Sequence, residues 1–180
     1  MRRVRPILFV TIAFAAAAAA PLTGCVTGEP QGGAPMALVN ASGQSIGTVR
    51  AWQTPGGISF RIDASNLPPG IHGIHVHGVG RCDPPDFASA GGHWNPAGKH
   101  HGLNNPAGPH AGDLPNVTVA ANGVLQETVV LPHATLAELL DADGAALVLH
   151  AAADDNMTDP SGNSGARIAC AVVTGSAELR

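Results

Sequence analysis

The chain has 180 residues, with nine Lys and Arg, thirteen Asp and Glu, nine His, and a formal net charge of −4 at pH 7. That length fits one domain plus additional segments. The acidic balance argues against nucleic acid as a partner, because such proteins carry a basic face, and against electrostatic docking on anionic lipid.

The first residues have the layout of an export signal. A basic region at residues 2–5 precedes an apolar run at 7–20 that is too short to form a stable membrane span. Residues 22–25, Leu-Thr-Gly-Cys, resemble the lipobox of bacterial lipoproteins, which is cleaved before a lipid-modified cysteine. We therefore expect a lipoprotein signal peptide at 1–24 and lipidation of Cys25. The alternative is an ordinary signal peptide in which Cys25 is incidental.

These features predict an exported protein of the bacterial cell envelope, anchored to a membrane by lipid and facing the periplasm. Beyond Cys25 the chain keeps six basic against thirteen acidic residues, a net charge of −7. Residues 25–35 are rich in Gly and Pro and predict a flexible tether. Residues 36–175 remain for one folded domain, and 176–180 form a short tail.

The three cysteines support export. If Cys25 carries lipid, Cys82 and Cys170 are left to pair in an oxidising compartment. Such a bridge would stabilise the fold by about 4–5 kcal/mol in the chain-entropy model. The alternative is a pair of separate buried thiols.

The domain reads as all-β. Apolar residues alternate with polar ones from Ile58 to Ser65, which indicates a half-buried strand. A dipeptide at Asn122-Gly123 favours a hairpin, and Thr135 with Glu138 has the spacing of a helix capping box. The other expected strands are 37–40, 44–53, 70–77, 116–120, 123–130, 146–150 and 167–172.

The fold class is therefore all-β, a Greek-key β-sandwich or barrel of the immunoglobulin-like kind. Two long non-periodic stretches interrupt it, at roughly 80–114 and 151–166. Loops of this length in a compact domain are usually functional.

One short stretch carries the first chemistry. His75 and His77 are two residues apart on an expected strand, so their imidazoles point to the same face, opposite Ile74 and Val76. Two imidazoles fixed side by side make half of a metal site.

Three segments together resemble the copper/zinc superoxide dismutase family. Residues 70–77, Gly-Ile-His-Gly-Ile-His-Val-His, are similar to one family signature, although Ile74 stands where the family usually has an aromatic residue. Residues 89–96, Ser-Ala-Gly-Gly-His-Trp-Asn-Pro, resemble the bridging-histidine segment. Residues 162–170, Gly-Asn-Ser-Gly-Ala-Arg-Ile-Ala-Cys, resemble the second signature.

The resemblance implies one copper and one zinc ion per subunit. The copper ligands would be His75, His77, His93 and His150. The zinc ligands would be His93, His101, His110 and Asp113, with His93 shared between the two metals. His101 keeps the family spacing better than its neighbour His100, which stays the alternative. These donor sets suit the two metals, because imidazole nitrogens bind copper and zinc well and a carboxylate can complete a closed zinc site.

Other residues match further family positions. Asp154 matches the carboxylate that links a copper-ligand histidine to a zinc-ligand histidine. Arg167 matches the guanidinium that guides the anion towards copper, and Cys82 with Cys170 matches the intradomain disulfide. The resemblance assigns catalytic roles to Arg167 and to His93, which would carry a proton.

The implied activity converts two superoxide anions and two protons to dioxygen and hydrogen peroxide by Cu(II)/Cu(I) cycling. The second hypothesis is a non-catalytic copper- and zinc-binding lipoprotein that stores or delivers metal on the same fold. Superoxide is the expected substrate, nucleic acid is not an expected partner, and the family allows either a homodimer or a monomer. We expect His72 to be structural, and His100 and His133 to face solvent.

Overall fold

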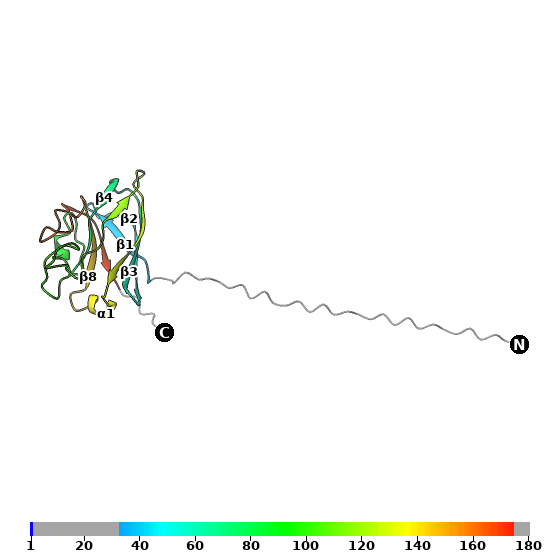
Figure 1. The fold of residues 1–180 in the computed structure, drawn as a ribbon. Coiled ribbons are helices and arrows are strands. Elements are labelled where there is room, and N and C mark those ends of the chain that lie inside the picture. Colours follow the sequence, from blue (N-terminus) through cyan, green and yellow to red (C-terminus); the bar gives the residue numbers. More distant parts are fainter. Residues whose placement is uncertain (2–32, 175–180) are drawn as a thin grey trace. The chain divides into compact units, whose positions relative to one another are not determined.

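The computed structural model describes Met1 and residues 33–174. Figure 1 draws the remaining residues as a thin grey trace. Nearly all of the expected signal peptide at 1–24, the expected lipidation site Cys25, most of the expected tether and the tail at 176–180 lie outside the described residues.

The described part is built from β-strands, with one 3-10 turn and one short helix. The strands are β1 (Met36–Asn40), β2 (Ser45–Thr54), β3 (Gly57–Ala64), β4 (Gly70–His72), β5 (Ile74–His77), β6 (Val117–Val119), β7 (Leu125–Pro132), β8 (Ala145–His150) and β9 (Arg167–Val173). The 3-10 turn η1 spans Ala88–Ala90, and α1 spans Leu136–Leu139. The all-β prediction is confirmed. No helix among the described residues is long and apolar enough to cross a membrane.

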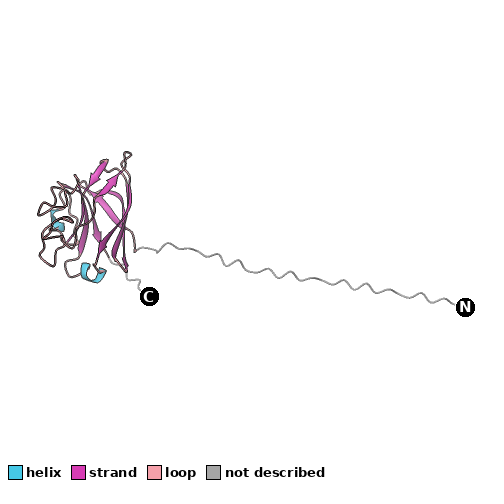
Figure 2. Cartoon of the chain, viewed as in Figure 1, coloured by secondary structure: helices cyan, strands magenta, loops and turns pink. Residues whose placement is uncertain are grey.

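Antiparallel pairing joins seven strands in the order β5-β8-β9-β1-β2-β3-β7, and β4 pairs separately with β6. The connection from β5 to β6 is a first loop, residues 78–116, and β8 to β9 is a second loop, residues 151–166. Figure 2 shows the loops gathered at one side of the strands, with η1 among them. Both expected long loops are thus confirmed, and they are neighbours in space.

The core follows from the alternation seen in the sequence. Ile58, Phe60 and Ile62 of β3 are buried and Arg61 and Asp63 are half-buried, whereas Ser59, expected on the polar side, is buried as well. The buried residues pack with Val49 of β2 and with Ile74 and Val76 of β5 in one apolar cluster. Each fully buried aliphatic or aromatic side chain stabilises the fold by roughly 1.5–3 kcal/mol. The apolar side of β5 therefore fixes the strand that carries His75 and His77.

The stretch 70–77 is two strands and not the single strand that the sequence suggested. β4 pairs with β6, whereas β5 pairs with β8. The break lies at Gly73, whose N–H donates to Ala152 O at 2.8 Å and whose carbonyl accepts from His150 N at 2.8 Å. A Cβ on Gly73 would stand 2.9 Å from Ser164 Cβ. The second loop therefore packs directly against the backbone at this point.

The Asn122-Gly123 turn forms, but it does not join two strands that continue as a hairpin. Ala120 N donates to Val124 O, and Gly123 N donates to Ala120 O, both at 2.9 Å. Beyond this turn β6 pairs with β4 and β7 pairs with β3. The turn signal was therefore correct, but the expected hairpin pairing was not, since β6 pairs with β4 over three residues and β7 with β3 over eight.

The expected capping box begins α1. The Thr135 hydroxyl accepts from Glu138 N at 3.2 Å, and the Glu138 carboxylate accepts from Thr135 N at 2.9 Å. This reciprocal pair satisfies two backbone N–H groups that a helix start leaves free.

Candidate metal centre

Four histidines from three separate parts of the chain converge in one place. His75 and His77 come from β5, His93 from the first loop, and His150 from the end of β8. One nitrogen of each ring lies within 4.8 Å of one nitrogen of the others. Isolated backbone bridges join His77 to His93 and His75 to Asp113, so the first loop is held against β5.

Each of these four rings has one buried nitrogen without a hydrogen-bond partner. Within the described chain, the side-chain polar atoms that are buried and unpartnered are His75 Nδ1, His77 Nε2, His93 Nε2 and His150 Nε2. Buried polar atoms in proteins are nearly always paired, because an unpaired one costs roughly 1–3 kcal/mol. Four such atoms in one cluster therefore fit a metal ion that needs four nitrogen donors.

The other ring nitrogen of each of the three strand histidines, His75, His77 and His150, faces an oxygen of the protein. His75 Nε2 lies 2.6 Å from Asp154 Oδ2, His77 Nδ1 lies 2.9 Å from Gly91 O, and His150 Nδ1 lies 3.2 Å from Gly165 O. Each acceptor fixes the proton on the nitrogen that faces it, so the free nitrogen presents a lone pair.

Burial keeps these rings neutral. It lowers the pKa of His77 to about 2 and that of His150 to about 3, and it also lowers the pKa of His75. At neutral pH the unpaired nitrogens are therefore available to bind a metal without first losing a proton.

A second donor cluster shares His93. The Asp113 Oδ1 atom lies 2.9 Å from His93 Nδ1 and 3.0 Å from His101 Nδ1. His110 Nδ1 lies 3.3 Å from His93 Nδ1 and 3.5 Å from Asp113 Oδ1. Donor atoms of a tetrahedral zinc site stand about 3.3 Å apart, given metal–ligand distances of about 2.0–2.1 Å. Asp113 Oδ1 therefore lies near zinc-site spacing from one nitrogen of each of the three histidines.

His75 could also belong to this second cluster, because one ligand atom of each of His75, His93, His101 and Asp113 lies within 4.8 Å of the others. We favour His110 as the fourth donor, because both nitrogens of His75 have another role. Its Nε2 faces Asp154 at 2.6 Å and its Nδ1 belongs to the first cluster. His110 Nδ1, in contrast, faces the second cluster directly.

Asp113 is positioned by backbone donors. Its Oδ2 accepts from Gly102 N at 2.8 Å and from His110 N at 3.0 Å, which leaves Oδ1 for the cluster. Burial by itself would raise the pKa of Asp113, but the hydrogen bonds from His93 and from Gly102 N lower that pKa to about 2. The carboxylate is therefore ionised at any physiological pH.

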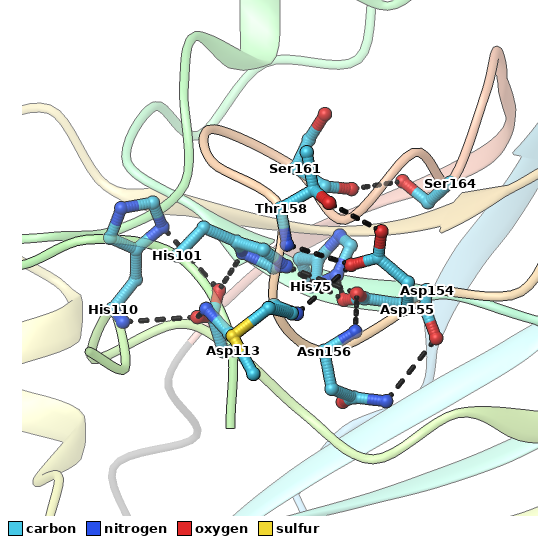
Figure 3. A network of polar contacts seen from close by, with 12 residues as sticks. His75, His101, His110, Asp113, Asp154, Asp155, Asn156, Thr158, Ser161 and Ser164 are labelled. Carbon is cyan, nitrogen blue, oxygen red and sulfur yellow. Dashed lines mark hydrogen bonds and ion pairs between the residues drawn. The ribbon is translucent and has the colours of Figure 1, made fainter. Parts of the chain in front are cut away.

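Asp154 connects the two clusters by contacting one histidine of each. Its carboxylate lies 2.6 Å from His75 Nε2 and 3.1 Å from His101 Nε2. Figure 3 draws Asp154 with the histidines and the polar residues of the second loop around it. Burial would raise the pKa of Asp154, and the hydrogen bonds from His75 and His101 lower it to about 2. A Cβ on Gly162 would collide with the Asp154 carboxylate and stand 2.8 Å from His101 Nε2. The second loop thus fits closely around this carboxylate.

Arg167 stands beside the first cluster. Its guanidinium donates to Phe87 O at 2.6 Å and to Gly91 O at 2.7 Å, and Gly91 O also accepts from His77 Nδ1. Partial burial lowers the pKa of Arg167. An arginine stays charged in proteins, so the site holds a fixed cation next to the four histidines.

Three other histidines lie where the sequence predicted, His72 inside the fold and His100 and His133 at the surface. His72 is buried, and its ring nitrogens lie 2.8 Å from His150 O and 2.8 Å from Pro68 O. The His100 side chain is 61% exposed, whereas His101 is fully buried among the donors, which favours His101. His133 is exposed.

Cys82 and Cys170 form a disulfide, so the prediction of a bridge is confirmed and the alternative of two separate thiols is wrong. The bridge ties the first loop to β9. It sits over a small apolar cluster that contains Phe87, Ala90 and Val148. The anchored loop carries His93 and the two carbonyls that hold Arg167.

Two polar side chains were missed in the sequence. Asn116 Nδ2 donates to Asp154 O at 2.8 Å, and Asn116 Oδ1 accepts from Asp154 N at 2.8 Å. Asp159 Oδ1 accepts from His101 N at 2.6 Å. These contacts span 38 and 58 residues, so no local spacing could have indicated them.

The loops of this antiparallel β-barrel bring together a four-histidine cluster and a cluster of three histidines and one aspartate, with one histidine shared. This arrangement defines a two-metal protein of the copper and zinc type. Residues 45–173 match the model of the family described as copper/zinc superoxide dismutase. The chain belongs to this family.

Similar proteins come from several bacteria. The superoxide dismutase [Cu-Zn] 1 of Aquifex aeolicus is 47% identical over 142 residues, which cover 76% of this chain and 84% of that protein. The crystal structure of a SOD-like protein from Bacillus subtilis is 43% identical with a TM-score of 0.75, covering 79% of this chain and 99% of the other. The Cu/Zn superoxide dismutase from Brucella abortus is 35% identical with a TM-score of 0.67, covering 78% and 99%.

Proposed function

We infer that this chain is an oxidoreductase that dismutates superoxide. We assign copper to His75, His77, His93 and His150, and zinc to His93, His101, His110 and Asp113. The observation that carries this inference is the set of four buried, unpartnered nitrogens beside a second cluster, in which Asp113 Oδ1 lies 2.9–3.5 Å from one nitrogen of each of three histidines. Membership of the copper/zinc superoxide dismutase family supports it.

Copper, when bound, supplies an ion that exchanges one electron with each of two superoxide anions, giving dioxygen and, with two protons, hydrogen peroxide. The protein supplies the rest. Arg167 attracts and orients the anion through its fixed charge. His93 Nε2 has no protein partner, so it is an atom that can hold and give a proton beside the substrate. The buried Asp113 and Asp154 carboxylates hold the rings in place.

Storage or delivery of metal is not favoured. A protein that hands metal to a partner needs ligands that the partner can reach. Here the side chains of His75 and His101 are 0% exposed and that of His93 is 4% exposed. Enclosed ligands suit a resident cofactor.

The direct test is metal content and superoxide removal by the purified full chain after loading with copper and zinc. We expect one copper and one zinc per chain and activity that requires copper. A protein that retains both metals and leaves superoxide untouched would favour storage. Sedimentation of the same sample distinguishes a homodimer from a monomer.

Arg167→Ala is expected to keep both metals and to lower kcat/KM for superoxide by about tenfold or more, since electrostatic steering raises association rates by 10–10³. The remaining rate should depend less on ionic strength, because salt screens the attraction that was removed. Stopped-flow decay of superoxide at several salt concentrations measures both effects.

Arg81→Ala is the matched control, because it removes an equal charge from an exposed site, where Arg81 pairs with Asp83. It should change the rate less than twofold. If both variants slow the reaction equally, net charge rather than the position of Arg167 is responsible.

We also propose that the protein is exported and carries lipid on Cys25, which anchors it to a membrane of the cell envelope on the periplasmic side. The sequence pattern at residues 1–25 supports this. The Cys82–Cys170 disulfide is consistent with an oxidising compartment.

Cys25→Ser is expected to release the protein from the membrane fraction into the soluble fraction, because a lipid-modified chain binds a membrane far more strongly than an unmodified one. Cell fractionation and the intact mass of the parent chain test this. A parent chain whose mass shows no lipid would rule the anchor out.

A further inference from the structure

Asp159 of the second loop meets the first loop at the zinc-side histidines. Its Oδ1 accepts from the backbone N–H of His101 at 2.6 Å and lies 3.8 Å from His110 Nε2. Its Oδ2 lies 3.3 Å from Nδ1 of the exposed His100. The Asp159 side chain is 46% exposed, so it reaches the cluster from the outside.

In two other histidines around the site, a carboxylate that faces the outer ring nitrogen orients the ring. His75 Nε2 and His101 Nε2 both face Asp154, so one carboxylate orients a ring of each cluster. His110 has a different carboxylate partner. Its Nδ1 points into the cluster, and its Nε2 faces Asp159. At 3.8 Å this is a charge contact and not a direct hydrogen bond. It still favours a proton on Nε2, and therefore a lone pair on Nδ1.

The contact to His101 acts on the backbone. A charge-assisted hydrogen bond from an amide N–H to a carboxylate is short and strong. It fixes the residue whose ring lies between Asp113 and Asp154. One exposed carboxylate on the second loop therefore touches two of the three histidines of the second donor cluster.

We propose that Asp159 is a positioning residue for zinc, which holds His101 through its backbone and His110 through its ring. The proposal rests on the zinc assignment made above. It predicts that zinc affinity depends on Asp159 and that copper affinity does not. The outer nitrogens of His75, His77 and His150 face Asp154, Gly91 O and Gly165 O instead of Asp159.

Asp159→Ala is expected to lower zinc affinity by about 10–100-fold, the usual cost of losing a partner that orients metal ligands. Asp159→Asn should restore part of it, because its amide oxygen can still accept from His101 N while the charge facing His110 is lost. Zinc affinity is measured by competition with a chromophoric chelator on the full, copper-free chain. Absorption of the protein with one equivalent of Co²⁺ reports the geometry of the site.

Two controls separate positioning from general loop order. Asp155→Ala removes a carboxylate of the same loop that accepts from Met157 N, Thr158 N and Asn163 Nδ2, none of them in a proposed ligand. His100→Ala removes the surface partner of Asp159 and leaves its contacts to His101 and His110. Both controls should keep zinc affinity within about threefold of the parent.

The proposal is supported if zinc affinity falls in the order parent, Asp159→Asn, Asp159→Ala, with altered Co²⁺ bands and unchanged copper affinity. It is overturned if Asp159→Ala binds zinc like the parent, if Asp155→Ala loses as much, or if copper is weakened equally. A parent chain that binds no zinc would instead overturn the zinc assignment, and this proposal with it.

Discussion

Replacing His75 by alanine is expected to reduce superoxide removal to below about a hundredth of the parent rate while zinc is retained. The His75 side chain is 0% exposed, and its free Nδ1 is one of the four nitrogens of the copper-side cluster. Losing even an outer partner of a metal ligand costs about 10–100-fold in affinity or activity, so losing a ligand should cost at least as much. The zinc side keeps its own contact, because Asp154 still faces His101.

His100→Ala is the matched control for this result. It removes the same side chain from a position that is 61% exposed and should leave activity and both metals unchanged. Loss of zinc in this variant would show that His100, and not His101, is the ligand. A His75→Ala protein that keeps more than about a tenth of the parent activity at equal copper content would refute the copper assignment.

Two of the proposed donor residues could be named from the sequence for a physical reason. His75 and His77 are two residues apart on a strand, so alternation alone places both rings on one side, away from Ile74 and Val76. The positions of His93, His101, His110 and His150 came instead from the resemblance of short motifs. Nothing in the periodicity of the chain would bring a residue at 150 next to one at 75, because long-range pairing of β5 with β8 does that.

The choice between His100 and His101 shows where the sequence was insufficient. Adjacent histidines have the same chemistry and nearly the same spacing to other motifs. The structure separates them by burial, because Asp113 and Asp154 face the His101 ring while His100 turns to solvent. Register in an irregular loop is set by such contacts and not by a repeating pattern.

Backbone groups are the part of the site that no residue pattern could indicate. Phe87 O and Gly91 O hold Arg167, and Gly91 O also accepts from His77. Any residue type offers a carbonyl, so these acceptors leave no trace in the sequence. The same is true of the break at Gly73, where the close approach of the second loop divides the expected strand.

Reduction of the Cys82–Cys170 disulfide is expected to lower the free energy of unfolding by about 4–5 kcal/mol, which is a large part of the total stability of a domain. The bridge joins residues 88 apart in sequence, so it removes much of the conformational freedom of the unfolded chain. The measurement is chemical denaturation of the metal-free full chain with and without reductant, in a Cys25→Ser background that prevents thiol exchange. Metal must be absent, because metal that binds only the native state would add to the apparent stability.

Local consequences of reduction should appear at Arg167. Cys170 lies three residues after Arg167 on β9, and Cys82 lies on the loop whose Phe87 and Gly91 carbonyls hold the guanidinium. Without the bridge, that loop still contacts β9 through these hydrogen bonds and through the packing of Phe87 and Ala90. Reduced, metal-loaded protein should therefore show a lower kcat/KM with a weaker salt dependence, as Arg167→Ala does. A Cys82→Ala, Cys170→Ala double variant should be insensitive to reductant. A loss of stability below about 1 kcal/mol on reduction would contradict the chain-entropy estimate.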